Sequence, residues 1–207
     1  MSVAATNIKG FLQTLPERVT LVAVTKTIPV EIIRTVYDQG YKKFGENKVQ
    51  EILTKKPCLP EDIDWHMIGH LQSNKVKYIA PFIKLIHSVD NSKLLRVINN
   101  EGVKNKRKIN CLLQIHIAEE ETKYGFSFDE AEELLASSDY QSYNNIKICG
   151  LMGMATFTNN MDQVRKEFRG LADFFTYLGN KYFYSSDHFS ELSMGMSGDY
   201  KVALEEG

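Results

Sequence analysis

The sequence lacks the features that mark membrane proteins, secreted proteins and nucleic-acid-binding proteins. No apolar run approaches the roughly 20 residues of a membrane span, and the amino terminus has no basic and apolar signal pattern. The formal net charge is -1, which gives no indication of binding to nucleic acid or to an anionic membrane. The three cysteines, Cys58, Cys111 and Cys149, are too widely spaced for a metal site. We therefore expect a cytoplasmic protein with reduced thiols, no metal ion, no membrane contact and no nucleic-acid partner.

The sequence also lacks a Gly-x-Gly-x-x-Gly turn after its first apolar run, so it has no dinucleotide-binding fingerprint. What it does contain is a regular alternation of strand-like and helix-like segments. The strand candidates are 21–26, 42–46, 64–69, 84–89, 109–117, 146–154 and 190–194. The helix candidates are 29–39, 47–55, 73–80, 91–102, 128–137, 161–182 and 198–206. This alternation predicts parallel strands joined by helices.

Parallel strands with helical crossovers form either an open doubly wound sheet or a closed barrel. We favour an α/β fold of the single (β/α)8 TIM-barrel type, because the dinucleotide fingerprint is absent and the chain length of 207 residues suits one barrel domain spanning residues 1–207. A barrel of this type has eight strands and only seven candidates are found. The prediction is therefore a barrel whose last strand is missing from this chain.

Several residues predict helix boundaries. Pro29, Asn91 and Ser127 stand immediately before helical patterns, where proline and capping side chains are favoured. Gly40 and Gly102 stand at the ends of helical patterns, as C-cap glycines do.

Lys26 ends the first strand candidate, Leu21-Val22-Ala23-Val24-Thr25-Lys26. Ligands bind at the carboxyl ends of the strands in barrel and doubly wound folds. An amine held there, partly out of water, can attack a carbonyl and form a Schiff base. The simpler interpretation is a solvated lysine at a strand end, so other residues must support a chemical role.

Polar groups also occur at the other strand ends, and each alone is weak evidence. They are Glu46, Asn47, His66, His70, Asp90, His116 and Thr156. A histidine at a strand end is more often structural than a ligand. Glu46-Asn47 can equally serve as a helix cap. The methionines at 152, 154, 194 and 196 are most simply core residues that line the barrel.

The segment from Ser193 to Asp199 is more informative. It combines glycines and two hydroxyls directly before a helical pattern, and free N–H groups at a helix start attract anions. Barrel phosphate sites are often built from the loops after strands seven and eight. A phosphate site together with a Schiff-base lysine points to pyridoxal phosphate or to a sugar phosphate.

The sequence resembles the pyridoxal phosphate homeostasis proteins, which are relatives of the amino-terminal barrel of alanine racemase. The resemblance spans almost the whole chain. The matching runs are Leu-Val-Ala-Val-Thr-Lys at 21–26, Phe-Gly-Glu-Asn-Lys-Val-Gln-Glu at 44–51, Trp-His-Met-Ile-Gly-His-Leu-Gln-Ser-Asn-Lys at 65–75, Ser-Val-Asp at 88–90, Lys-Tyr-Gly at 123–125, Gly-Leu-Met-Gly-Met-Ala-Thr at 150–156 and Leu-Ser-Met-Gly-Met-Ser-Gly-Asp at 192–199. The run at 65–75 and the Ser-Met-Gly-Met-Ser run are the most specific.

The resemblance implies a barrel that holds pyridoxal 5'-phosphate on the strand-one lysine, here Lys26. It implies a carrier or regulator of the cofactor, with enzymes that use the cofactor as candidate recipients and no catalytic residue of its own. Asn47 matches a residue near the cofactor ring, and His66 matches a histidine beside the pocket. The implied cofactor-binding residues are Lys26, Asn47, His66, Met154, Ser193, Gly195 and Ser197.

The resemblance also implies two differences from the related proteins. In the family the chain continues past residue 207 into a Gly-Ser-Thr and an Arg-Ile-Gly segment, which form the last strand and complete the cofactor site. In the racemases a second acid–base group, a tyrosine, comes from a separate β domain of a partner chain, and this sequence contains no such domain. Racemisation needs acid–base groups on both faces of the cofactor.

We therefore expect a monomeric carrier. The alternatives are a racemase, a Schiff-base aldolase, or a barrel scaffold with weakened cofactor binding.

Overall fold

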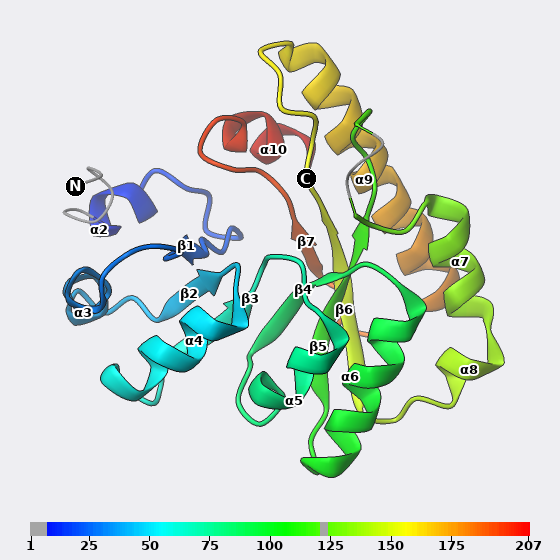
Figure 1. Cartoon of the computed structure of the whole chain (residues 1–207). Helices are drawn as coiled ribbons and strands as arrows, with labels where there is room; N and C mark the ends of the chain where they lie inside the picture. The colour runs from blue at the N-terminus through cyan, green and yellow to red at the C-terminus, as the bar shows by residue number, and fades with distance from the viewer. Residues whose placement is uncertain (1–7, 121–123) are drawn as a thin grey trace.

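The structure is a computed structural model that describes residues 8–120 and 124–207. Lys123, in the run at 123–125, lies outside the described residues. Seven parallel strands form one sheet in the order β1 to β7 (Figure 1). The strands are β1 Ala23–Val24, β2 Lys43–Glu46, β3 Asp64–Met67, β4 Leu85–Val89, β5 Ile109–Ile115, β6 Ile146–Gly153 and β7 Glu191–Ser193. All seven predicted strands are confirmed.

Helices connect the strands and surround the sheet (Figure 1). They are α2 Ile8–Leu12, α3 Val30–Asp38, α4 Val49–Lys55, α5 Val76–Ile79, α6 Ser92–Lys104, α7 Phe128–Ala136, α8 Ser138–Gln141, α9 Met161–Tyr182 and α10 Tyr200–Glu206. Two 3-10 turns, η1 Lys56–Cys58 and η2 Ser73–Lys75, precede β3 and α5. Among these described helices, none combines the length and the apolarity that a membrane span requires.

The sheet is curled into a half-barrel. Its strands follow one another in sequence order, whereas a doubly wound sheet reverses its order partway. The curl brings Ser193 on β7 within hydrogen-bonding distance of His87 on β4, with Oγ and Nδ1 2.8 Å apart. No strand in the described part of the chain joins β7 to β1. The predicted barrel type with seven strands is confirmed.

Apolar side chains fill the space between the sheet and the helices. Phe44 and Trp65 on neighbouring strands belong to the same buried cluster as Ile52 of α4, and all three are at most 2% exposed. Because side chains alternate between the two faces of a strand, a second and smaller cluster lies on the inner face. It consists of Leu85, Leu112, Cys149 and Met152, with Met154 packed against it.

The sulfur-containing side chains differ in how deeply they are buried. Cys111 and Cys149 are free and buried in β5 and β6, as expected for structural thiols. Met152 is buried, but Met196 is 50% exposed, so its assignment to the core was wrong. Met196 lies in the turn after β7, beyond the last strand that could cover it.

Helix boundaries largely follow the predicted capping residues. The Asn91 side chain accepts from the Leu94 N–H, and Ser127 forms a capping box at the start of α7. Gly40 has φ of +94° after α3, as a C-cap glycine should. Gly102 is not a helix end, because α6 continues to Lys104. It is a contact glycine, since a Cβ there would lie 2.5 Å from the Asn145 carbonyl oxygen.

Candidate functional site

Lys26 lies in a tight turn just beyond the carboxyl end of β1. The Ile28 N–H donates to the Thr25 carbonyl at 2.9 Å and closes the turn. The predicted position of the lysine at this edge of the sheet is confirmed, although β1 is shorter than the predicted 21–26. Lys26 is exposed rather than partly buried, because β1 is the edge strand of the described sheet, with β2 on one side and no described strand on the other. None of the described residues forms a hydrogen bond or an ion pair with its amine.

The turn contains a strained residue. Thr27 has φ of +62°, in the left-handed region that β-branched residues avoid. Its N–H donates to Glu51 Oε2 of α4 at 2.8 Å. Such a backbone conformation persists where the surrounding structure enforces it, and it tends to occur at functional sites.

A buried ion network lies behind this turn, on the helix side of the sheet. Lys55 Nζ is 2.6 Å from Glu46 Oε1 and 2.8 Å from Glu51 Oε2, and it donates to the Thr25 carbonyl at 2.7 Å. Thr25 Oγ1 donates to the same Glu46 oxygen at 2.6 Å. Burial opposes the charge on Lys55, but its hydrogen bonds to the two carboxylates raise its pKa. The hydrogen bond from Lys55 lowers the pKa of Glu51.

The sequence interpretation of Glu46-Asn47 as a helix cap is wrong. The helix α4 begins at Val49, and its N-cap position, Lys48, makes no side-chain capping bond. Glu46 is fully buried because it faces α4, and its charge is balanced by Lys55. Its second oxygen, Oε2, has no hydrogen-bond partner among the described residues.

Two buried histidines and a serine form a hydrogen-bonded chain on the inner face of the sheet. His66 Nδ1 lies 2.9 Å from His87 Nε2, and His87 Nδ1 lies 2.8 Å from Ser193 Oγ. Burial lowers the pKa of His66 to about 4. Burial, reinforced by the neighbouring His66, lowers the pKa of His87 to about 3. Both rings are therefore neutral at neutral pH.

Neutrality leaves only two proton arrangements for this chain, since each neutral ring carries one N–H. In one, His66 donates to His87, His87 donates to Ser193, and the serine hydroxyl is free to donate outward. In the other, every bond is reversed and the serine hydroxyl donates to His87. Only the first arrangement allows Ser193 to donate to an anion.

Asn47 lies at the carboxyl edge, where the loops after β2 and β3 pack tightly. A Cβ on Gly69 would lie 2.5 Å from the Asn47 carbonyl oxygen, so only glycine allows this approach. His70, which follows Gly69 in the sequence, pairs with the buried Asp90 at 2.8 Å. Its ring stacks on that of Tyr124, with the ring centroids 4.1 Å apart. The close approach of Gly69 to Asn47 therefore holds the loops after β2 and β3 together at this edge.

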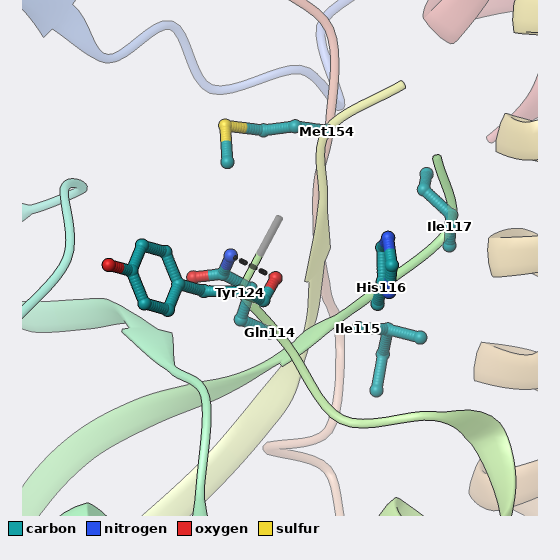
Figure 2. A pocket seen from close by; sticks show the side chains of 6 residues that line it. All are labelled: Gln114, Ile115, His116, Ile117, Tyr124 and Met154. Atoms are coloured by element: carbon teal, nitrogen blue, oxygen red, sulfur yellow. Dashed lines mark hydrogen bonds between the residues drawn. The ribbon is translucent and has the colours of Figure 1, made fainter. Parts of the chain in front are cut away.

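A small hollow lies beside the ends of β5 and β6, and Met154 is part of its wall. Its lining residues are Gln114, Ile115, His116, Ile117, Tyr124 and Met154. Figure 2 shows the Gln114 amide bonded to the Tyr124 carbonyl, a contact of 2.8 Å. His116 bonds through Nε2 to the Glu120 carbonyl at 2.9 Å, which supports the structural interpretation of this histidine. Met154, by contrast, is only partly buried at the rim.

The turn from Ser193 to Asp199 joins β7 to α10. Gly195 has φ of +81°, and a Cβ there would lie 2.8 Å from the Ala203 side chain, so the backbone sits directly against α10. Ser197 is exposed. The Met196 N–H, however, is already bonded to the Asp199 carboxylate. One of the N–H groups expected to attract an anion is therefore occupied.

The structure thus links some of the predicted residues and leaves others apart. His66 and Ser193 are joined through His87. Among the described residues, no hydrogen bond or ion pair joins Lys26 to Asn47 or to Ser193. His87 was missed in the sequence, although a lone histidine at an alternate position of the apolar strand β4 was a signal. Glu51 and Lys55 were missed as well, and their signal was an i,i+4 pair in the helix that follows β2.

Comparison with known proteins relates this half-barrel to one family. Residues 2–203 match the alanine racemase N-terminal domain. Two similar curated proteins are both called pyridoxal phosphate homeostasis protein. The one from Aquifex aeolicus (strain VF5) is 39% identical over 188 residues, covering 90% of this chain and 80% of the relative. The one from Escherichia coli (strain K12) is 32% identical over 196 residues, covering 93% and 81%.

Comparison with solved structures also relates this chain to proteins of the same fold. PipY of Synechococcus elongatus PCC7942, solved with PLP bound, is 30% identical with a TM-score of 0.86, covering 98% of this chain and 93% of PipY. An alanine racemase of Clostridium difficile 630 is 12% identical with a TM-score of 0.72, and the match covers 96% of this chain but 50% of the racemase. This second likeness shows the fold alone.

Proposed function

The chain belongs to the alanine racemase N-terminal domain family and, within it, to the pyridoxal phosphate homeostasis proteins, and we propose that it binds pyridoxal 5'-phosphate covalently through Lys26. The observation that carries this proposal is the exposed amine of Lys26, which no described residue bonds, at the carboxyl edge of the sheet. The cofactor supplies an aldehyde that an amine can attack to form a Schiff base. The role that follows is storage, delivery or regulation of the cofactor.

The residues around the rim fit this ligand. The exposed amine of Lys26 would react with the aldehyde. The hydroxyls of Ser193 and Ser197 and the backbone at Gly195 would hold the phosphate. The close approach of Gly195 to α10 supports this assignment, because a side chain at that position would alter the turn. Asn47 and Met154 would lie beside the ring, and His66 would act through His87.

The histidine chain would orient the phosphate-binding hydroxyl. With His66 donating to His87 and His87 donating to Ser193, the serine proton is directed away from the rings. Because both histidines are neutral, they add no charge of their own and serve only to direct this hydrogen bond.

We further propose that the chain forms one unit over residues 1–207 and acts as a monomeric cofactor carrier in the cytoplasm rather than as a racemase. The names of its relatives support a homeostasis role. Racemisation requires acid–base groups on both faces of the cofactor. Enzymes that use pyridoxal phosphate are the candidate recipients.

Borohydride trapping tests this proposal. The protein is mixed with pyridoxal phosphate, reduced, digested and mapped by mass. We expect one major adduct at Lys26, and none at that position in Lys26→Arg, which keeps the positive charge. An adduct confined to other lysines would contradict the proposal. A racemisation assay with alanine separates carrier from enzyme, since turnover abolished by Lys26→Arg would favour an enzyme.

A further inference from the structure

Two side chains of α4 hold both peptide groups that flank Lys26. Lys55 Nζ donates to the Thr25 carbonyl at 2.7 Å, which belongs to the peptide before Lys26. Glu51 Oε2 accepts the Thr27 N–H at 2.8 Å, which belongs to the peptide after it. Glu51 and Lys55 are themselves ion-paired one helical turn apart. The backbone on either side of Lys26 is therefore bonded to one ion pair on one helix.

Burial makes this pair different from the surface ion pairs of the protein. The Lys55 side chain is 9% exposed and that of Glu51 is 24% exposed, and the second partner of Lys55, Glu46, is fully buried. Charge-assisted hydrogen bonds shielded from water are stronger and more directional than exposed ones. The Lys42–Asp62 pair near the opposite ends of β2 and β3 has side chains about half exposed, where ion pairs contribute little.

The Lys26 turn needs such external support. It follows a strand of two residues at the edge of the sheet, and among the described strands only β2 pairs with it. Thr27 is held in a left-handed conformation that a β-branched residue would otherwise leave. The two bonds from α4 approach from the helix side of the sheet, and the Lys26 side chain remains exposed and is not bonded by any described residue.

We infer that the Glu51–Lys55 pair positions Lys26, and thereby sets how fast its amine reacts with an aldehyde. This inference rests on the proposed function. In the reaction, the amine nitrogen replaces the aldehyde oxygen, which leaves as water. Neither Glu51 nor Lys55 bonds the amine, so both are positioning residues. A lysine whose backbone is fixed loses less conformational freedom when it reacts than one on a mobile turn.

The test compares two aldehydes, pyridoxal phosphate and pyridoxal, which lacks the phosphate. Glu51→Gln keeps the side-chain shape but removes the charge. We expect it to slow labelling of Lys26 about tenfold with both aldehydes, as a charge-assisted hydrogen bond becomes a neutral one. Ser193→Ala should slow labelling with pyridoxal phosphate only. Asp62→Asn, which removes an ion pair from the opposite end of the same strands, should label at the wild-type rate.

Amide hydrogen exchange in the ligand-free protein gives a second readout that does not depend on the reaction. The Thr27 N–H should exchange faster in Glu51→Gln by about the same factor, because its acceptor is weakened. Glu51→Ala, which removes the acceptor, should exchange faster still. The Glu51 side chain is partly exposed, so both variants are expected to fold.

Each result has a definite meaning. Labelling of Glu51→Gln at the wild-type rate with both aldehydes would overturn the inference and leave the proposed function standing. Failure of the wild-type protein to label at Lys26 would overturn the proposed function. Hydrogen exchange of the Thr27 N–H would then test only whether Glu51 holds the Lys26 turn. Unchanged exchange of the Thr27 N–H in both Glu51 variants would show that Glu51 does not hold this peptide group, and would also overturn the inference.

Discussion

Replacing Lys55 by methionine should destabilise the protein strongly. Methionine retains much of the apolar stem of lysine but removes its three polar contacts, which are the bonds to Glu46, to Glu51 and to the Thr25 carbonyl. Glu46 would remain fully buried with no cation beside it, and one of its oxygens already lacks a hydrogen-bond partner among the described residues. An uncompensated buried charge is the expensive outcome when one partner of such a pair is removed.

The expected loss is about 3–5 kcal/mol of unfolding free energy, the range for breaking a buried ion pair. Urea unfolding followed by circular dichroism measures it through the shift of the midpoint at constant slope. The double variant Glu46→Gln/Lys55→Met removes the stranded charge and should recover part of the loss. Asp62→Asn is the matched control, because its pair with Lys42 is about half exposed, and it should cost less than about 1 kcal/mol.

Two results would refute this reasoning. One is a loss below about 1 kcal/mol for Lys55→Met, which would mean that water reaches Glu46 and that the network is not buried as described. The other is a double variant as unstable as the single one, which would show that lost packing rather than the stranded carboxylate causes the effect.

Two further predictions follow from the inner face and the rim. The pKa values of His66 and His87 in the folded protein are lowered to about 4 and about 3. Below the ordinary histidine pKa, the unfolded chain therefore binds protons at these two rings, whereas the folded protein does not. Stability should be full above about pH 6.5 and fall below it by about 1.4 kcal/mol per pH unit for each ring, and a His66→Gln/His87→Gln variant should lose most of that slope in urea titrations between about pH 6 and pH 5. Gly69→Ala should destabilise by about 1–3 kcal/mol and reduce pyridoxal phosphate binding, because its Cβ would meet the Asn47 backbone. Gly170→Ala in α9, where nothing lies within 4 Å, is the control and should be neutral or stabilising; thermal unfolding of both variants measures the difference.

The order and type of the strands and the main helices could be predicted because they depend on local patterns. A short run of β-branched residues ended by a proline indicates a strand wherever it lies in the fold. The first strand was predicted too long, at 21–26 instead of Ala23–Val24, because pairing and not sequence ends a strand. At the edge of the sheet β2 is the single described strand that pairs with it, so fewer of its residues join the ladder.

The position of Lys26 could also be predicted, because the end of a strand defines the functional edge of a parallel sheet. The groups that support it could not. His87 and Ser193 are 106 positions apart in sequence, and they meet only because the sheet curls. From the sequence, Glu46-Asn47 could equally have been a helix cap, because Asn and acidic groups suit a helix start, but Glu46 is buried and paired with Lys55 instead.

By itself, the sequence determined the seven parallel strands, their order, the lysine at the end of the first strand and the resemblance to a cofactor-binding family. Only the tertiary structure decided that Lys26 is exposed, that its flanking peptide groups are bonded to an ion pair on α4, and that two neutral histidines and Ser193 form one hydrogen-bonded chain. The physical reason is that periodicity depends on neighbours along the chain. Burial and the pairing of polar side chains depend instead on the register and curl of the whole sheet, which no local pattern contains.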